Sequence, residues 1–194
     1  MATLTGLRRA GPGRVLLELD GRPWRTVPDE VVIRCGLSAG TPLERPRLRE
    51  LRRELRRAQA LATATRALSS RDLSRRRLEE RLRERGIAPE AGAEAVAALE
   101  EAGILDGERL ARTRGGALAE RGWGDAAVRA RLEREGVSPD LVRRVIAELA
   151  PEEERAEAFV AGEADPRMAW KRLSRRGFAP GTIETVIGAL DEDA

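Results

Sequence analysis

The chain has 194 residues, 41% apolar, 36% charged and 3% aromatic, with a formal net charge of +3. No apolar stretch is long enough to cross a bilayer and no signal peptide follows Met1, which excludes a membrane protein and predicts a cytoplasmic one. The single cysteine, Cys35, excludes an internal disulfide and, because it lies beside the apolar run 31–33, predicts a buried structural thiol.

The first 27 residues have strand character. A cluster of Gly and Pro at 10–13 separates the first two strands, and Asp20-Gly21 predicts a tight hairpin turn before the third. A short helix follows and ends at Gly36. The predicted elements are strands at Thr3–Arg9, Arg14–Leu19 and Arg22–Val27 and a helix over 28–35.

Leucines then recur at helical spacing, which predicts a long helix over about 46–68 with arginines on its other sides. Residues 47–85 hold 14 Arg against 6 acidic residues, whereas residues 86–165 hold 10 Arg against 18. A chain with a basic and an acidic part is suited to a charged partner. Solvated helix faces with ion pairs such as Glu79–Arg83 explain the arginines equally well.

One sequence cassette occurs three times. At its centre is a glycine followed by an apolar residue and, three positions after the glycine, by a proline; these glycines are Gly86, Gly136 and Gly177. A leucine stands four positions before each glycine, and twelve before it stands a residue that can start a helix, namely Ser74, Gly124 or Asp165. Each glycine fits the left-handed end of one helix, and each proline fits the first turn of the next.

Another helical stretch precedes each cassette, so each repeat is expected to hold three helices that share a core with their neighbours. The predicted fold class is mainly all-α, with three tandem three-helix repeats in an elongated array after a small three-strand appendage. Two adjacent glycines, Gly115 and Gly116, favour a kink or a break in the helix over Glu108–Glu120. The predicted divisions are an appendage at 1–45 and repeats at 46–105, 106–150 and 151–194.

The chain has few of the residue types that usually act in catalysis. There is no histidine, and the one cysteine is expected to be buried, so the usual nucleophile–base pairs and zinc clusters are missing. The carboxylate pairs fall in solvent-facing charge runs. We therefore predict a protein that is not an enzyme and that holds no cofactor and no metal.

Binding through arginine is the function that remains, because guanidinium groups bind phosphates and carboxylates in pairs of hydrogen bonds. With few aromatic residues for stacking, contact with DNA is expected to be weak and mainly with phosphates. Trp123 either packs between helices or anchors a partner, and Trp170, beside the inward Ala169, is expected in the core. The candidate contact residues are Arg71, Arg75, Arg76, Arg77, Arg81, Arg83, Arg121, Trp123 and Arg129.

The order of these motifs, together with the threefold repeat, resembles the RecX family of RecA regulators. The resemblance covers about 58–190. The N-terminal hairpin also resembles an extension of many RecX proteins. The segments that carry the resemblance are Ala67–Ser74 leading to Leu78 and Leu82, Leu105–Ala111, and Arg121–Gly124 leading to Val128, Leu132, Gly136 and Val137.

The resemblance implies a curved, elongated monomer that binds in the groove of the RecA–DNA filament. It implies inhibition of the recombinase, ATPase and coprotease activities of RecA, and thus a role in recombination, DNA repair and the SOS response. The family brings no catalytic residues. Two positions depart from its pattern: Leu110 stands where an aromatic residue is common, and Arg77 where an acid is common.

Two other functions stay open on the residues alone. The short link between the second and third helices of each repeat is also typical of a helix-turn-helix, so the chain is alternatively a non-catalytic DNA-binding protein that contacts single- or double-stranded DNA. A helical scaffold for a different partner is the third possibility.

Overall fold

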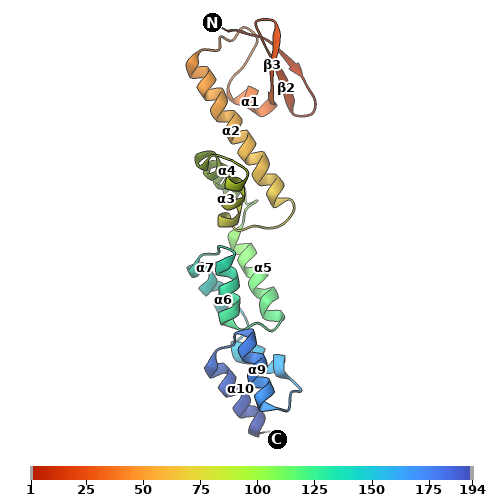
Figure 1. Cartoon of the computed structure of the whole chain (residues 1–194), viewed down its shortest axis with the longest axis vertical. Helices are drawn as coiled ribbons and strands as arrows, with labels where there is room; N and C mark the ends of the chain where they lie inside the picture. Colours follow the sequence, from red (N-terminus) through yellow and green to blue (C-terminus); the bar gives the residue numbers. More distant parts are fainter. Residues whose placement is uncertain (1, 193–194) are drawn as a thin grey trace. The chain divides into compact units, whose positions relative to one another are not determined.

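The structure, a computed structural model, describes residues 2–192, with side chains up to residue 189. It is mainly helical with one small antiparallel sheet, as the sequence predicted (Figure 1). The elements are β1 (Leu4–Arg9), β2 (Arg14–Leu19), β3 (Arg22–Pro28), α1 (Asp29–Arg34), α2 (Arg45–Leu68), α3 (Arg75–Glu84), α4 (Pro89–Glu101), α5 (Gly107–Glu120), α6 (Asp125–Arg134), α7 (Pro139–Ala147), α8 (Glu152–Val160), α9 (Pro166–Arg176) and α10 (Pro180–Glu192).

Contacts divide the chain into two compact units. The first unit holds the residues up to Arg71 together with Leu78–Ile104, and the second holds Asp72–Arg77 together with the residues from Leu105 onward. The division into an appendage and three repeats ending at 105, 150 and 194 stays a prediction. In the part of the chain that the structure describes, no helix has both the length and the apolar character needed to cross a bilayer.

In the first unit, the sheet has the order β1-β2-β3 and packs with α1 against α2. The turn between β2 and β3 is the predicted one, with positive φ at both Asp20 and Gly21, which is the conformation that a two-residue hairpin needs. Cys35 is buried in this core. Burial raises the pKa of its thiol, and the nearby carboxylates of Glu50 and Glu54 raise it further, so this is a structural cysteine.

The far half of α2 is lined by small residues. Ala60, Ala64 and Ala67 are buried there, so α4 packs closely against α2. From α4 the apolar residues of the cassette, among them Val96 and Leu99, are buried as predicted.

In the second unit, α5, α6 and α7 share one core, and α8, α9 and α10 share another (Figure 1). The cassette places equivalent residues in the two cores: Leu132 and Leu173 are buried in the second helix of each trio. Gly136 and Gly177 have φ of +89° and +76°, the left-handed conformation that the sequence predicted. Leu190, the last apolar residue of the third cassette, has a side chain outside the described residues.

Helix α5 runs without interruption through Gly115 and Gly116, so the expected break is absent. The reason is close packing, since a Cβ on Gly115 would lie 2.6 Å from Cγ1 of Val145. Gly115 is thus the residue that lets α7 approach α5, and this packing offsets the low helix propensity of glycine.

Candidate interaction surface

Most of the predicted contact residues lie on the surface. Arg81 and Trp123 are half-buried. The exposed ones are Arg71, Arg75, Arg76, Arg77, Arg83, Arg121 and Arg129. They come from the two ends of α3 and the loop before it, from the C-cap of α5 and from α6.

The start of α3 is fixed by a buried serine. Ser74 Oγ accepts a hydrogen bond of 3.2 Å from the backbone nitrogen of Arg77, which is the predicted helix cap, and donates to the carbonyl oxygen of Glu135. The guanidinium of Arg77 donates to the carbonyl oxygen of Arg134 at 3.1 Å. The first turn of α3 is therefore fastened to the end of α6.

The other arginines of this turn also have partners. Arg75, Arg76 and Arg77 each take part in polar or charged interactions within the chain. A Cβ on Gly136 would lie 2.8 Å from Cβ of Arg76, so the two segments are in close contact. These three arginines have partners within the chain as well as reaching the surface, which the sequence did not reveal.

Trp123 has the packing role that was one of its two predicted alternatives. Its ring packs against the core of α5–α7 and lies under the guanidinium groups of Arg131, at 3.4 Å from the ring centroid, and Arg176, at 4.4 Å. Because Arg131 belongs to α6 and Arg176 to α9, the ring joins two helices from different trios. Contact of Trp123 with a partner stays a prediction.

Around Trp123 the two trios of the second unit are joined by ion pairs and hydrogen bonds. The side chain of Arg155 is 9% exposed, pairs with Asp125, and donates to the carbonyl oxygens of Trp123 at 2.8 Å and Ala150 at 2.9 Å. Glu152 accepts from the backbone nitrogen of Asp125 at 2.6 Å. Sequence reasoning missed Arg155, since Trp123 and Asp125 lie about 30 positions away.

Two glycines bring the backbones of these trios together. Gly124 donates from its backbone nitrogen to the carbonyl oxygen of Arg176 at 2.9 Å, and a Cβ on Gly124 would overlap the backbone at Gly177 and Phe178. The contact of Ser74 with Glu135 and Gly136 uses equivalent positions of the preceding cassette. The first residues of the second helix of one cassette therefore contact the last residues of the second helix of the following cassette. This occurs at two places, Ser74 with Glu135 and Gly136, and Gly124 with Arg176 and Gly177, which we together call the glycine joint.

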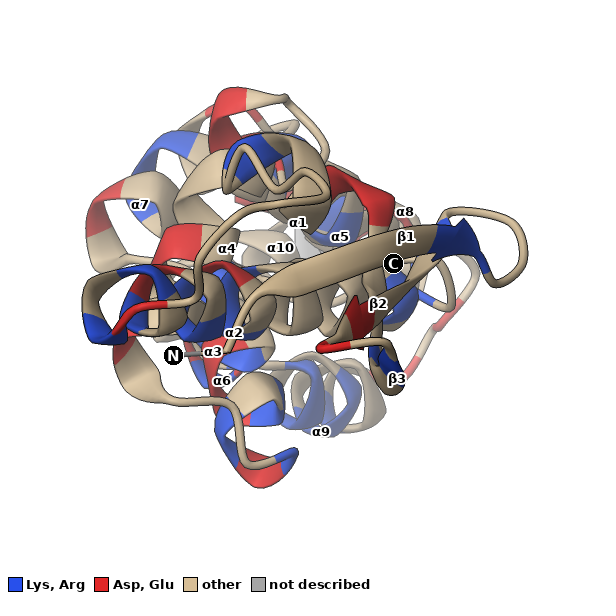
Figure 2. Cartoon of the chain, turned by 90° about the horizontal axis from the view of Figure 1, so that it is seen from above, with Lys and Arg blue, Asp and Glu red and all other residues tan. Residues whose placement is uncertain are grey.

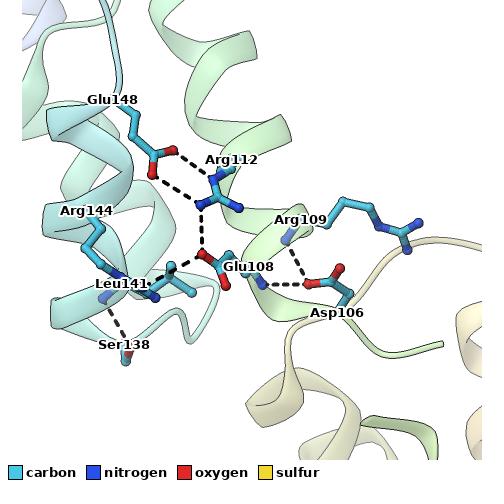
Figure 3. Close-up of polar contacts among 8 residues, drawn as sticks. All are labelled: Asp106, Glu108, Arg109, Arg112, Ser138, Leu141, Arg144 and Glu148. Carbon is cyan, nitrogen blue, oxygen red and sulfur yellow. Dashed lines mark hydrogen bonds and ion pairs between the residues drawn. The ribbon is translucent and has the colours of Figure 1, made fainter. Parts of the chain in front are cut away.

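A third group of charges lies on the outer side of α5 and α7 (Figure 3). Arg112 makes two hydrogen bonds to the carboxylate of Glu148, at 2.8 and 3.2 Å, and pairs with Glu108 at 2.8 Å. Arg144 lies 3.8 Å from the same carboxylate of Glu108. Here the arginines form solvated ion pairs on helix surfaces. Such pairs were the alternative to a charged partner as an explanation of the many arginines.

We expect a pH titration by NMR to place the pKa of Glu148 below its ordinary value, because the hydrogen bonds from Arg112 stabilise the charged carboxylate. A lowered pKa means that the pair stabilises the fold above the pKa of the unfolded chain and that this stabilisation is lost as pH falls through the folded value. Arg112→Gln should raise the pKa of Glu148. Arg109→Gln, on the same helix but with its side chain turned away (Figure 3), should leave it unchanged. An unchanged pKa in Arg112→Gln would contradict the assignment.

The prediction for Trp170 was wrong: its side chain is 44% exposed on α9. Ala169 and Leu173 fill the buried side of this helix. Successive positions of a helix are about 100° apart, so Trp170 is turned away from the core that Ala169 faces.

The described residues contain no group of three or more His, Cys, Asp or Glu side chains placed to hold a metal ion. The arrangement is one of exposed arginines, ion pairs and tight helix contacts. It is suited to binding a charged partner.

No family model matches the chain. A "Regulatory protein RecX" of Deinococcus radiodurans is 32% identical over 165 residues, which cover 80% of this chain and 79% of the relative. The chain belongs to the RecX family. Regulatory proteins RecX of Halorhodospira halophila and Chromohalobacter salexigens are 31% and 35% identical, over 67% and 59% of this chain and over 87% and 82% of their own lengths.

Solved structures agree with this assignment at the level of the fold. A crystal structure of a regulatory protein RecX superposes with a TM-score of 0.83 at 18% identity, covering 96% of this chain and 98% of that one. RecX from Lactobacillus salivarius gives 0.63 at 15% identity, covering 70% of this chain and 97% of its own. The RecX resemblance and the mainly helical fold class are thereby confirmed.

Proposed function

We propose that this RecX-family chain binds the RecA–DNA filament and modulates, mostly inhibits, the recombinase, ATPase and coprotease activities of RecA. The observation that carries the proposal is the 32% identity with a regulatory protein RecX over four-fifths of the chain. On this proposal the chain acts as a cytoplasmic monomer in recombination, DNA repair and the SOS response, and it is a binding protein without catalytic residues.

The distribution of charge supports a partner that is itself charged. In the first and third cassettes the second helix is basic: α3 holds five Arg and three Glu, and α9 holds five basic and no acidic residues. Such surfaces speed encounter and fix register on a polyanion. Several weakly binding helices along one filament reinforce one another through effective concentration.

The helix-turn-helix alternative is less well supported, since its recognition helix would be the third of each trio. Helix α4 has four Glu and no basic residue, so it would be repelled by DNA phosphates. In α7 the only basic residues, Arg143 and Arg144, pair with Asp140 and Glu108. Neither of these two trios therefore has a basic third helix that could recognise duplex DNA.

We expect substoichiometric amounts of the protein to slow ATP hydrolysis by RecA on single-stranded DNA. The measurement is RecA ATPase activity with and without the protein over a series of salt concentrations, because phosphate contacts weaken as salt rises. An unchanged rate at equimolar protein would contradict the proposal. Capture of a different partner with no binding of RecA would favour the scaffold alternative.

The candidate arginines are tested by a variant that spares the glycine joint. Arg71, Arg83 and Arg129 have no ion pair or side-chain hydrogen bond within the described residues, so Arg71→Glu/Arg83→Glu/Arg129→Glu should fold normally. We expect it to need about tenfold more protein for half-inhibition, a modest change for exposed charges. Inhibition equal to that of the unmodified protein would mean that these three arginines do not contact the filament.

A further inference from the structure

Helix α9 presents a basic outer face. Its five basic residues face no acidic residue on the same helix, and its ribbon is blue along much of its length (Figure 2). Ala169 and Leu173 turn the opposite side into the core of α8–α10. The outward residues are Arg167, Met168, Trp170, Lys171, Ser174 and Arg175.

Two of the five cations are used inside the second unit. Arg172 pairs with Glu163 at 3.2 Å and donates to the carbonyl oxygen of Phe159 at 3.2 Å. Arg176 lies over the ring of Trp123. The other three, Arg167, Lys171 and Arg175, form no ion pair and no side-chain hydrogen bond within residues 2–192.

Trp170 stands in the middle of these free cations. Arg167 is three positions before it and Ser174 four positions after it, and these spacings make neighbours on a helix surface. An indole left 44% exposed keeps much apolar area in water. An exposed indole contributes little to the stability of the fold. A ligand that covers the Trp170 ring would remove this apolar area from water, and binding would therefore be favourable.

The first cassette shows that packing of the second helix does not require these residues. Trp170, Lys171 and Arg175 are equivalent to Glu79, Glu80 and Glu84 of α3, counted from the cassette glycine. The residues that pack are the same kind in both helices, Leu82 of α3 and Leu173 of α9, and both are buried. The outward face of α9 thus carries an exposed indole and two cations at positions where α3 has three glutamates, of which Glu79 and Glu80 are half-buried.

We propose that this face of α9 binds single-stranded nucleic acid, with a base stacked on Trp170 and phosphates held by Arg167, Lys171 and Arg175. Single strands expose the faces of their bases, whereas a duplex buries them, so an exposed indole among cations selects the single strand. The inference deepens the DNA contact of the proposed function, on which it rests for its biological setting, but the binding itself needs no RecA.

The stacking is tested by binding of the full chain, without RecA, to a fluorescently labelled oligothymidylate. Stacking of one base on an aromatic side chain contributes about 1–3 kcal/mol, so Trp170→Ala should weaken binding at least about fivefold, and Trp170→Phe should keep most of it. Trp24→Ala is the matched control, because Trp24 is similarly exposed, at 40%, but lies on β3. Its binding should be unchanged.

The phosphate contacts are tested by charge reversal at equal net charge. Arg167→Glu/Lys171→Glu/Arg175→Glu should abolish most binding and reduce its salt dependence. The control reverses three exposed arginines of α2 without partners in the described chain, Arg49, Arg52 and Arg56, and should retain most binding.

Three outcomes would overturn the inference: unchanged oligothymidylate binding in Trp170→Ala, an equal loss in both charge-reversed proteins, or tighter binding of a duplex than of the single strand. If Trp170→Ala loses inhibition of RecA but keeps oligothymidylate binding, the face contacts protein and the inference is wrong. The RecA ATPase rate of the unmodified protein tests the proposed function separately.

Discussion

A Gly124→Ala substitution is expected to lower the free energy of unfolding of the second unit by about 2 kcal/mol, as for overpacking of a dense interface. The added Cβ would overlap backbone atoms of Gly177 and Phe178, which cannot rotate away as a side chain can. The trios α5–α7 and α8–α10 must then separate locally and lose the hydrogen bond from Gly124 to Arg176. Urea unfolding followed by circular dichroism measures the loss.

Two variants separate overlap from other effects. Gly124→Ser adds the same Cβ but a better helix cap, so it should be destabilised as well. Gly116→Ala lies in α5 with no atom near the new Cβ, and it should be neutral or stabilising by up to about 1 kcal/mol. If Gly124→Ala unfolds at the same urea concentration as the unmodified protein, the glycine joint is not tight.

An Arg155→Ala substitution is expected to cost about 3 kcal/mol, within the range for breaking a buried ion pair. It removes the partner of Asp125 and leaves the carbonyl oxygens of Trp123 and Ala150 without their donors. The cost is placed at the low end because Asp125 is still 33% exposed and keeps some water. The same urea unfolding experiment measures it.

The matched control is Arg143→Ala, which removes the same side chain from an ion pair with Asp140 in which both partners are exposed. Such pairs contribute about 0.2–1 kcal/mol, so this variant should be almost as stable as the unmodified protein. Equal stability losses in Arg143→Ala and Arg155→Ala would mean that burial of Arg155 has no energetic consequence.

These contacts give the arginines of this chain two different uses. Arg155 and Arg176 fasten helices to one another, while Arg71, Arg129 and Arg175 keep their charges directed to solvent. Arginine suits the first use because its planar guanidinium reaches several carbonyl oxygens at once. Reversal of the fastening arginines would therefore disturb the fold and confuse any binding experiment.

Much of the fold could be predicted from local sequence patterns. Glycine with positive φ, proline in the first turn and the capping residue twelve positions before each glycine are constraints within a few residues, and Gly136, Gly177 and Asp165 behave as predicted. Of the kink or break predicted at Gly115 and Gly116, the break is absent, because close packing against Val145 of a neighbouring helix determines the role of Gly115.

The candidate site could be predicted from the sequence only in part. The sequence named Arg71, Arg83 and Arg129 as candidate contact residues, and all three are exposed. Trp170 was misplaced because its neighbour Ala169 was used as a guide, although adjacent helix positions face different directions.

By itself the sequence determined the helices, their ends, the cassette leucines of each core and the family of the chain, because these depend on local backbone preference and on apolar spacing. Only the tertiary structure decided which arginines form contacts within the protein and which remain available to a partner. The reason is physical: contacts such as Arg77 with Arg134 join residues 57 positions apart, and no local pattern encodes whether two such side chains meet.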